Sequence, residues 1–382
     1  MFARHIQNII LLVIIFCSCR ENRVSQVNPP ERTNNEIKYA EHFYLEKHDN
    51  YTKLVLIDPW QKSEGVRFNY FLTRRGSKTN INADSSEIIT VPVRKVILMS
   101  TTYLPMVSIL GDEESIKGVS GTGFIFDNKI RSRVSEGLIY DVGYEENLNK
   151  ELIFRLAPEL IIAYGVGSEA AGNFRKLQES GIKIFFNADY LENSPLGRAE
   201  WIKVFGLLFG KEKRADSVFN ILENNYKEIK SYVNSRVDSR PSVMLGLPYR
   251  DSWFISPGNS FIGNLIEDAG GNYIWKDMKA DFSLPMSFEN VYINASKADF
   301  WLNTGNAQRL DDIISVDPRL AYFNSVQKGN LFNNNKRISE GGGNDFWESG
   351  ILHPDIILKD IASILHPGLY PDYEPFYYKK LK

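Results

Sequence analysis

The two cysteines of the chain are the residues whose chemistry first needs an explanation. The 382-residue sequence contains only Cys17 and Cys19, and both lie at the end of an unbroken apolar run over residues 9–16. A thiol can act as a nucleophile, a metal ligand or half of a disulfide. The apolar run is too short to cross a bilayer, which needs about 20 apolar residues. With Arg4 ahead of it, the run has the layout of a secretory signal.

Cys19 is the predicted lipidation site. Residues 16–19, FCSC, resemble the lipobox of bacterial lipoproteins, in which a cysteine becomes the lipidated first residue of the mature chain. Ser18 is the small residue that such a box requires before the cysteine, while Phe16 and Cys17 depart from the commonest pattern, so Cys17 stays the alternative. Lipidation of Cys19 would leave no other thiol, which excludes a disulfide and a zinc–thiolate site. We therefore expect an exported protein that is lipid-anchored to a membrane and faces the periplasm.

The other residue types used in catalysis are not arranged for it. The five histidines are His5, His42, His48, His353 and His366, and none forms an H-E-x-x-H pair. The glycine-rich stretches GVSGTG (118–123) and EGGGNDFW (340–347) lack the ending of a phosphate-binding loop, and no G-x-S-x-G elbow is present. The sequence therefore favours a protein that is not an enzyme, and it predicts no catalytic residue, no resident cofactor and no metal ligand.

Charge and composition narrow the classes of partner. The formal net charge is −2 and the chain has no block of lysine and arginine, so we expect no nucleic-acid partner. Aromatic residues make up 13% of the sequence, which suits a binding cleft as well as a core.

The pattern along the chain indicates an α/β architecture. Residues 42–95 contain short alternating or apolar runs that are typical of strands. From residue 96 strand and helix patterns alternate, with strands over 96–100, 160–163 and 182–188, which implies a parallel sheet with helices on its faces. At Ser194 and Pro195 a helical pattern begins that continues to Gly210, and a second follows. After Pro241 the alternation resumes.

We therefore predict two Rossmann-like α/β lobes joined by long linking helices, with a β-rich N-terminal extension. The predicted segments are a lipoprotein signal (1–19), a disordered tether (20–41), an N-terminal lobe with its β-rich extension (42–194), linking helices (195–238) and a C-terminal lobe (239–382).

Residues from about 90 to 382 resemble the class III substrate-binding proteins of ABC importers, which bind iron-siderophores, haem and cobalamin. The resemblance is carried by NKELIFRLAPELIIAYG (149–165) in the first lobe, and by SFIGNLIEDAGGNYIW (260–275) and SFENVYINASKADFWL (287–302) in the second. The resemblance is more specific when the order and spacing of these segments, and the linking helices between them, are taken together than when any one segment is taken alone. Residues 42–90 lie outside it.

The resemblance implies a protein that captures a metal chelate, either an iron-siderophore or a cobalamin or haem, in a cleft between the lobes. It also implies delivery of the chelate to an ABC permease with its ATPase. By position in the motifs, Glu151 and Glu289 would dock on arginine pockets of the permease, and an acid in the first turn of a helix stays ionised. We expect a monomer whose partners are the chelate, the permease and the membrane.

Six residues are candidate ligand contacts on the same basis. Tyr103 follows the first strand of the N-terminal lobe, where the family lines its cleft. The others are three aromatic residues near strand ends and two cations that could neutralise an anionic chelate: Tyr140, Tyr164, Trp253, Arg250 and Arg337. The metal would travel inside the chelate, so the protein need not coordinate it. Two alternatives stay open, namely a chelate-processing enzyme on the same scaffold and a surface adhesion lipoprotein.

Overall fold

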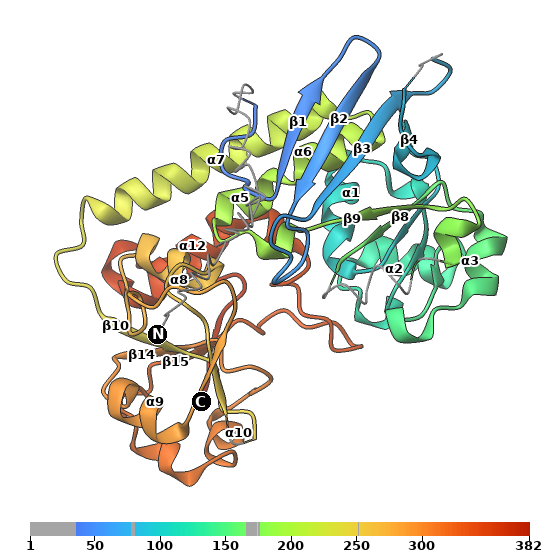
Figure 1. Ribbon diagram of the computed structural model, residues 1–382. Coiled ribbons are helices and arrows are strands. Elements are labelled where there is room, and N and C mark those ends of the chain that lie inside the picture. The colour runs from blue at the N-terminus through green and yellow to red at the C-terminus, as the bar shows by residue number, and fades with distance from the viewer. Residues whose placement is uncertain (1–35, 78–80, 166–173, 175, 251) are drawn as a thin grey trace, which may run out of the picture.

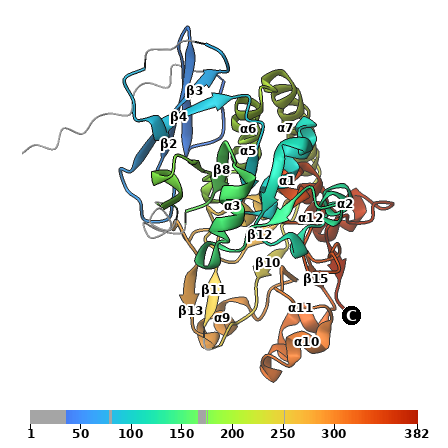
Figure 2. The same ribbon diagram turned by 90° about the vertical axis from the view of Figure 1, so that its right-hand side faces the viewer.

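The computed structural model describes residues 36–382, except residues 78–80, 166–173, 175 and 251. The predicted signal, most of the predicted tether and both cysteines, Cys17 and Cys19, lie outside the described residues. Figure 1 shows two α/β lobes with helices between them, and Figure 2 shows the N-terminal sheet and the C-terminal lobe at opposite ends of the molecule. The predicted fold class is confirmed. Within the described ranges, no helix is both long and apolar enough to cross a membrane.

The N-terminal extension is a four-stranded sheet. Its strands are β1 (Phe43–Lys47), β2 (Tyr51–Ile57), β3 (Arg67–Arg74) and β4 (Ile88–Val91), in that order across the sheet. The first three are antiparallel and β4 runs parallel to β3. Phe43 packs edge-on against Trp201, with ring centroids 4.8 Å apart, and Tyr70 lies 5.0 Å from Phe185. The sheet therefore shares one core with the lobe and the linking helices.

The N-terminal lobe contains a five-stranded parallel sheet in the order β7-β6-β5-β8-β9. The strands are β5 (Val96–Leu98), β6 (Ile116–Val119), β7 (Tyr140–Asp141), β8 (Leu160–Ala163) and β9 (Lys183–Phe186). Helices α1 (Leu104–Leu110), α2 (Asn128–Ser135) and α3 (Lys150–Leu156) belong to this lobe. All four residues of β8 are buried, as expected for a parallel strand covered on both faces.

Three helices link the lobes: α5 (Pro195–Glu200), α6 (Ile202–Phe209) and α7 (Glu212–Asn234). Ser194 caps α5, because its hydroxyl oxygen accepts the amide hydrogen of Gly197 at 3.2 Å, and Pro195 occupies the first turn as predicted. The single helix expected over 195–210 is divided at Trp201, whose fully buried indole packs under the N-terminal sheet. Helix α7 is the longest of the three, at 23 residues.

The C-terminal lobe has a second sheet, in the order β12-β10-β14-β15-β16. Its strands are β10 (Ser242–Leu245), β12 (Asn272–Tyr273), β14 (Phe300–Leu302), β15 (Leu331–Asn333) and β16 (Lys379–Lys380), and only β16 is antiparallel to its neighbour. A separate antiparallel pair is formed by β11 (Trp253–Ile255) and β13 (Leu284–Met286). The helices are α8 (Phe261–Asp268), α9 (Phe288–Ala295), α10 (Leu310–Ile314), α11 (Asn324–Gln327) and α12 (Pro354–Leu365).

The last residues of the predicted tether are held against the folded body. The carboxylate of Glu200, which is fully buried, accepts hydrogen bonds from the amides of Lys38, Tyr39 and Ala40 at 3.0, 2.7 and 3.0 Å. The buried carboxylate of Glu192 accepts the amide hydrogen of Glu41 at 3.0 Å. Two buried acids thus pair with the backbone of residues 38–41, which belong to the predicted tether.

The two glycine-rich stretches meet between the lobes. A Cβ atom built on Gly341 would overlap the carbonyl oxygen of Gly123, and one on Gly343 would overlap that of Phe124. Gly121 lies in a left-handed turn, as expected for a stretch interpreted as a turn. Glycine is required at Gly341 and Gly343 because the backbones of two lobes approach there without room for a side chain.

Candidate ligand cleft

A cavity of about 260 Å³ lies between the two lobes. Its N-terminal side is formed by residues that follow strands β5 and β9, and its other side by helix α8 and the segment that follows β15. Its lining consists of Thr102, Asp189, Tyr190, Arg198, Phe261, Phe346, Trp347, Gly350 and Ile351. Ligands of α/β proteins bind at the carboxyl ends of parallel strands, which is where this cavity is placed.

Local hydrogen bonds fix the N-terminal side of the cleft. A turn of 3₁₀-helix, Thr101–Tyr103, follows β5, and Ser100 caps it by accepting the amide hydrogen of Thr102 at 3.2 Å. A second such turn, Asp189–Leu191, follows β9. These short turns present Thr102 and Asp189 at one edge of the sheet.

Two charged residues of the cleft have buried atoms without a hydrogen-bond partner in the described structure, the Oδ2 oxygen of Asp189 and the Nε nitrogen of Arg198. Asp189 is only 2% exposed. Leaving a buried polar group unsatisfied costs about 1–3 kcal/mol, so such groups are rare unless a ligand or water completes them. Asp189 and Arg198 both line the cleft, so one carboxylic acid and one guanidinium border it.

Burial sets the protonation of this pair. It raises the pKa of Asp189 to about 6, although the nearby positive charge of Arg198 acts in the opposite direction. Burial also lowers the pKa of Arg198, against the attraction of Asp189. The guanidinium of Arg198 donates through Nη2 to the carbonyl oxygen of Tyr190 at 2.9 Å. It also lies 4.3 Å from the ring centroid of Phe261, which is a cation–π contact between a linking helix and the C-terminal lobe.

Aromatic residues supply the opposite wall. Phe346 and Trp347 pack edge-on with ring centroids 4.7 Å apart, and Trp347 is 50% exposed. A half-exposed indole beside a cavity gives a flat apolar surface with one N–H donor. This wall and the polar groups of the other lining residues suit a ligand with both apolar and polar faces.

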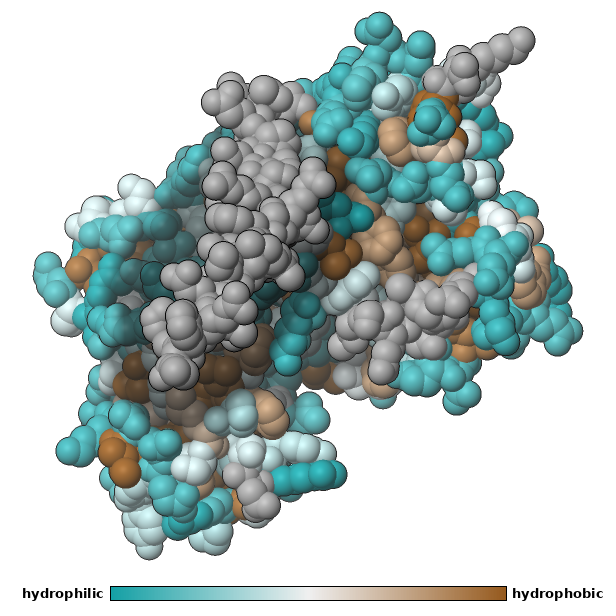
Figure 3. Space-filling model, in the orientation of Figure 1, coloured by the Kyte–Doolittle hydropathy of each residue, from teal (hydrophilic) through white to brown (hydrophobic). Residues whose placement is uncertain are grey.

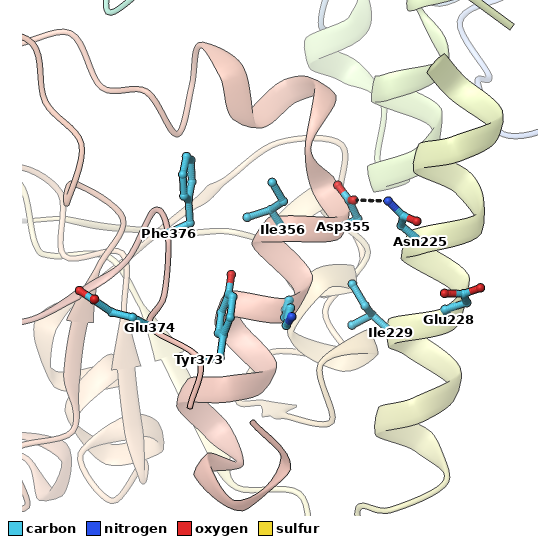
Figure 4. A pocket seen from close by; sticks show the side chains of 9 residues that line it. Asn225, Glu228, Ile229, Asp355, Ile356, Tyr373, Glu374 and Phe376 are labelled. Atoms are coloured by element: carbon cyan, nitrogen blue, oxygen red, sulfur yellow. Dashed lines mark hydrogen bonds between the residues drawn. The ribbon is translucent and has the colours of Figure 1, made fainter. Parts of the chain in front are cut away.

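A larger cavity, of about 440 Å³, lies elsewhere, between α7 and α12 (Figure 4). Asn225 and Glu228 of α7 line it from one side, and Asp355 and Ile356 of α12 from the other. The amide nitrogen of Asn225 donates to Asp355 at 3.1 Å, so the two helices are joined across the cavity. This cavity does not lie at the carboxyl ends of strands, and we place the ligand site in the cleft between the lobes.

The structure places two predicted contact residues in the core. Tyr103 is 1% exposed and packs against Phe205 at 6.1 Å, so its neighbour Thr102 lines the cleft instead. The prediction for Trp253 disagrees with the structure: its indole is fully buried, packs on Trp301 and donates through Nε1 to the carbonyl oxygen of Leu245 at 3.0 Å. Its role is to hold the C-terminal sheet.

Three other predicted contacts, Tyr164, Tyr140 and Arg250, are dispersed around the cleft and do not lie in it. Tyr164 follows β8 and is partly buried, and Tyr140 is exposed on the edge strand β7. Arg250 is exposed, with its guanidinium 5.2 Å from the ring of Tyr249. None of these residues lines the cavity.

Arg337 has a partner within the protein. Its Nε donates to the buried carboxylate of Asp345 at 2.6 Å, and its guanidinium lies between the rings of Phe126 and Phe376, at 4.8 and 4.1 Å. It lines a separate cavity of about 430 Å³ at the boundary of the lobes. These contacts explain Arg337 as a residue that joins the lobes.

The two acids predicted to dock on the permease are both exposed. Glu151 lies in the first turn of α3 on the N-terminal lobe, and Glu289 in the first turn of α9 on the C-terminal lobe (Figure 1). Glu289 lies 3.5 Å from Arg319, whose main partner is Asp317 at 2.7 Å. Both acids therefore remain open to solvent, one on each lobe.

The histidines of the last helix have structural surroundings. His366 contacts the carbonyl oxygen of Gly270 at 3.1 Å, and His353 immediately precedes α12. Among the residues that the structure describes, no group of three or more histidine, cysteine or acidic side chains could hold a metal ion.

Sequence reasoning missed Asp189, Arg198, Phe261 and Trp347. Asp189 follows the strand pattern IKIFFNA, and this position after a buried strand was the available signal for it. Trp347 lies in the stretch EGGGNDFW, whose glycines resemble a phosphate-binding loop and gave no sign of an aromatic cleft wall. Nothing in the sequence brings Arg198 and Phe261 together, because they lie on different helices 63 positions apart.

Comparison with known proteins identifies the family. The family model described as periplasmic binding protein matches residues 96–337. The chain belongs to the periplasmic binding protein family. It is 28% identical to an uncharacterized lipoprotein of Methanocaldococcus jannaschii over 307 residues, covering 78% of this chain and 71% of that protein. It is 27% identical to a cobalamin-binding protein of Halobacterium salinarum over 241 residues, covering 63% of this chain and 60% of that protein.

Solved structures share the fold at low sequence identity. A periplasmic haem-binding protein of Pseudomonas aeruginosa aligns with a TM-score of 0.56 and 15% identity, covering 76% of this chain and 98% of that chain. The triscatecholate siderophore-binding protein FeuA of Bacillus subtilis aligns with a TM-score of 0.54 and 16% identity, covering 73% and 94%. Membership of a solute-binding family confirms the prediction that the chain is a binding protein and not an enzyme. The β-rich N-terminal sheet lies outside the matched range.

Proposed function

We propose that this periplasmic binding protein captures a metal chelate, an iron-siderophore or a cobalamin or haem, in the cleft between its lobes. The observation that carries the proposal is the cavity at the carboxyl ends of the strands, which Trp347 and Phe346 line together with Asp189 and Arg198. A chelate presents apolar faces and polar edges, so it matches both walls. The cobalamin-binding relative and the haem-binding and siderophore-binding structural neighbours support this ligand class.

The second part of the proposal is delivery to an ABC permease. Glu151 and Glu289 are exposed in the first turns of helices on different lobes. An exposed carboxylate can pair bidentately with an arginine of a partner. Two such acids, one on each lobe, would let the permease contact both lobes at once.

The third part is attachment to a membrane through a lipid on Cys19. Cys19 lies outside the described residues, so the support comes from the lipobox-like sequence and from the lipoprotein relatives. Several acyl chains on one cysteine suffice for stable anchoring.

The two alternative functions have less support. An enzyme would need an acid–base pair in the cleft, whereas the described residues that line the cavity include one carboxylic acid, Asp189, and no histidine. An adhesion protein would need a broad apolar surface. On the visible part of the face in Figure 3, hydrophobic residues form separate groups within a mostly hydrophilic surface.

Titration of the purified full-length protein with haemin, a cyanocobalamin, a ferric triscatecholate and an uncharged ferric trihydroxamate tests the proposal. We expect saturable binding of one class, and loss of that binding in the Arg198→Ala variant. Binding of no chelate by a protein with a cooperative thermal transition would overturn it.

A further inference from the structure

The loop between β2 and β3, residues 58–66, lies against the carboxyl ends of the strands β8 and β9. The indole of Trp60 is 6.2 Å from the ring of Phe186, the last residue of β9. It also covers Gly165, two residues after β8, where an added Cβ would meet Trp60 at 3.0 Å. This is the edge of the sheet from which Thr102 and Asp189 line the cleft, so the loop extends that edge.

The loop is fixed by its own hydrogen bonds. The amide of Asp58 donates to the carbonyl oxygen of Val66 at 2.9 Å, and the amide of Val66 donates to the carboxylate of Asp58 at 3.1 Å. Between them, the amide of Ser63 donates to the carbonyl oxygen of Trp60 at 3.2 Å. These bonds order the loop around Trp60, and such pre-organisation lowers the entropic cost of binding.

One residue joins the loop directly to the cavity. Tyr190 lines the cleft, and its hydroxyl group donates to the carbonyl oxygen of Gly165. The backbone of Gln61 also acts on this hydroxyl and lowers its pKa, against the burial that raises it. The loop is thus in direct contact with a wall of the cavity.

The loop also reaches the other lobe. The ammonium group of Lys62 lies 5.1 Å from the ring centroid of Phe282, which precedes β13 in the C-terminal lobe. Lys62 is exposed, and in the described part of the chain no carboxylate forms an ion pair with it. A cation held at the boundary of the two lobes by an aromatic ring is available to an anion that reaches this boundary.

We propose that the loop 58–66 closes one side of the ligand cleft and that Lys62 pairs with an anionic oxygen of the bound chelate. This inference rests on the proposed function and deepens it, because it assigns the ligand to the anionic chelates: those with carboxylate, phosphate or catecholate oxygens. It also gives a role to the N-terminal sheet, which lies outside the range of the family match. Lys62 and Arg198 then attract the anionic ligand from two sides, and among the described lining residues Asp189 is the one acid that opposes them.

The test compares Lys62→Gln with a matched control, Lys213→Gln. Lys213 is exposed on the linking helix α7, away from the cleft. The probes are haemin, cyanocobalamin, a ferric triscatecholate and an uncharged ferric trihydroxamate, each titrated into the full-length protein at low and high salt. We expect Lys62→Gln to weaken binding of the anionic chelate by about tenfold and to reduce its salt dependence, since a charge-assisted contact is lost. Lys213→Gln should bind as the unchanged protein does.

The outcomes separate the inference from the proposed function. If the unchanged protein binds no chelate, the proposed function fails and the inference fails with it. If the unchanged protein binds an anionic chelate and Lys62→Gln binds it equally well, only the inference is overturned. Preference for the uncharged trihydroxamate would likewise overturn the role of Lys62 while leaving the proposed function in place.

Discussion

The carboxylate of Glu348 in the C-terminal lobe accepts a hydrogen bond, 2.9 Å long, from the amide of Asp127 at the start of helix α2 in the N-terminal lobe. Its second oxygen accepts the amide hydrogen of Phe126, also at 2.9 Å. Glu348 is only 4% exposed and follows Trp347 of the cleft wall directly. One buried acid therefore ties the lobes together beside the proposed ligand site.

The raised pKa of Glu348 predicts that the free energy of unfolding depends on pH. Burial raises its pKa to about 7, although the amides of Phe126 and Asp127 favour the ionised form. An unfolded glutamate titrates near about 4.3. At pH values between about 4.3 and 7, the folded protein binds the proton of Glu348 more tightly than the unfolded chain does. The stabilisation that this proton gives is therefore fully present below about pH 4.3, and it is lost as the pH rises through about 7.

The variant Glu348→Gln cannot titrate and isolates this effect. From pH 5 to pH 8, its free energy of unfolding should rise relative to that of the unchanged protein by on the order of 2–3 kcal/mol. Urea unfolding at both pH values measures the difference. An equal difference between the two proteins at pH 5 and pH 8 would show that Glu348 has no raised pKa.

The backbone contact between the glycine-rich stretches can be tested sterically. Gly343→Ala would place a Cβ in the position of the carbonyl oxygen of Phe124, so we expect a loss of about 1–3 kcal/mol of stability. Gly123→Ala is the matched control, because a Cβ there meets nothing within 4 Å. Thermal unfolding of both variants measures the effect, and equal stability would contradict the close approach of the lobes.

The N-terminal segment should contribute strongly to stability. Without residues 36–41, the buried carboxylates of Glu200 and Glu192 lose hydrogen bonds from backbone amides. The donors of these bonds are Lys38, Tyr39, Ala40 and Glu41. Removing the partners of a buried charge costs about 3–5 kcal/mol. A chain that begins at residue 42 should therefore be less stable by this order than one that begins at residue 36. Similar unfolding midpoints in urea would refute the interaction.

Reversing the charge of the proposed docking acids should separate transport from binding. Glu151→Arg and Glu289→Arg place a cation where an arginine of the permease would approach, so we expect uptake to fall at least about tenfold while chelate affinity is unchanged. Glu212→Arg is the matched control, because Glu212 is also an exposed acid in the first turn of a helix. Normal uptake by the Glu151 and Glu289 variants would exclude docking through these acids.

The sequence predicts the main elements well where their pattern is set by burial. The strand 160–163 is recovered because a parallel strand covered on both faces is a continuous apolar run. The pair β11 and β13 escapes prediction because β13 contains Pro285 and has no buried residue, so it lacks the apolar pattern of a strand. Within β11, Trp253 and Ile255 point inward and Phe254 is 53% exposed, so the alternation buries the indole that had been expected at the ligand.

The cleft itself could be predicted only in position, not in composition. Its polar residues come from separate segments, with Thr102 after β5, Asp189 after β9 and Trp347 in a loop of the other lobe. Sequence spacing places residues at a strand end, but it does not say which of two neighbours faces the cavity. This is why Tyr103 was chosen in place of Thr102. The contact between Lys62 and Phe282 depends on how a loop outside the family match lies across both lobes.

The most direct test of the account is tryptophan fluorescence during chelate titration. Four of the six tryptophans, Trp201, Trp253, Trp275 and Trp301, are buried. Trp347 lines the cleft, and Trp60 lies in the loop that we propose closes it. We predict saturable quenching by one chelate class, which the double variant Trp60→Phe, Trp347→Phe should largely remove. Quenching that persists undiminished in the double variant, or a folded protein that responds to no chelate, would contradict a chelate site between the lobes.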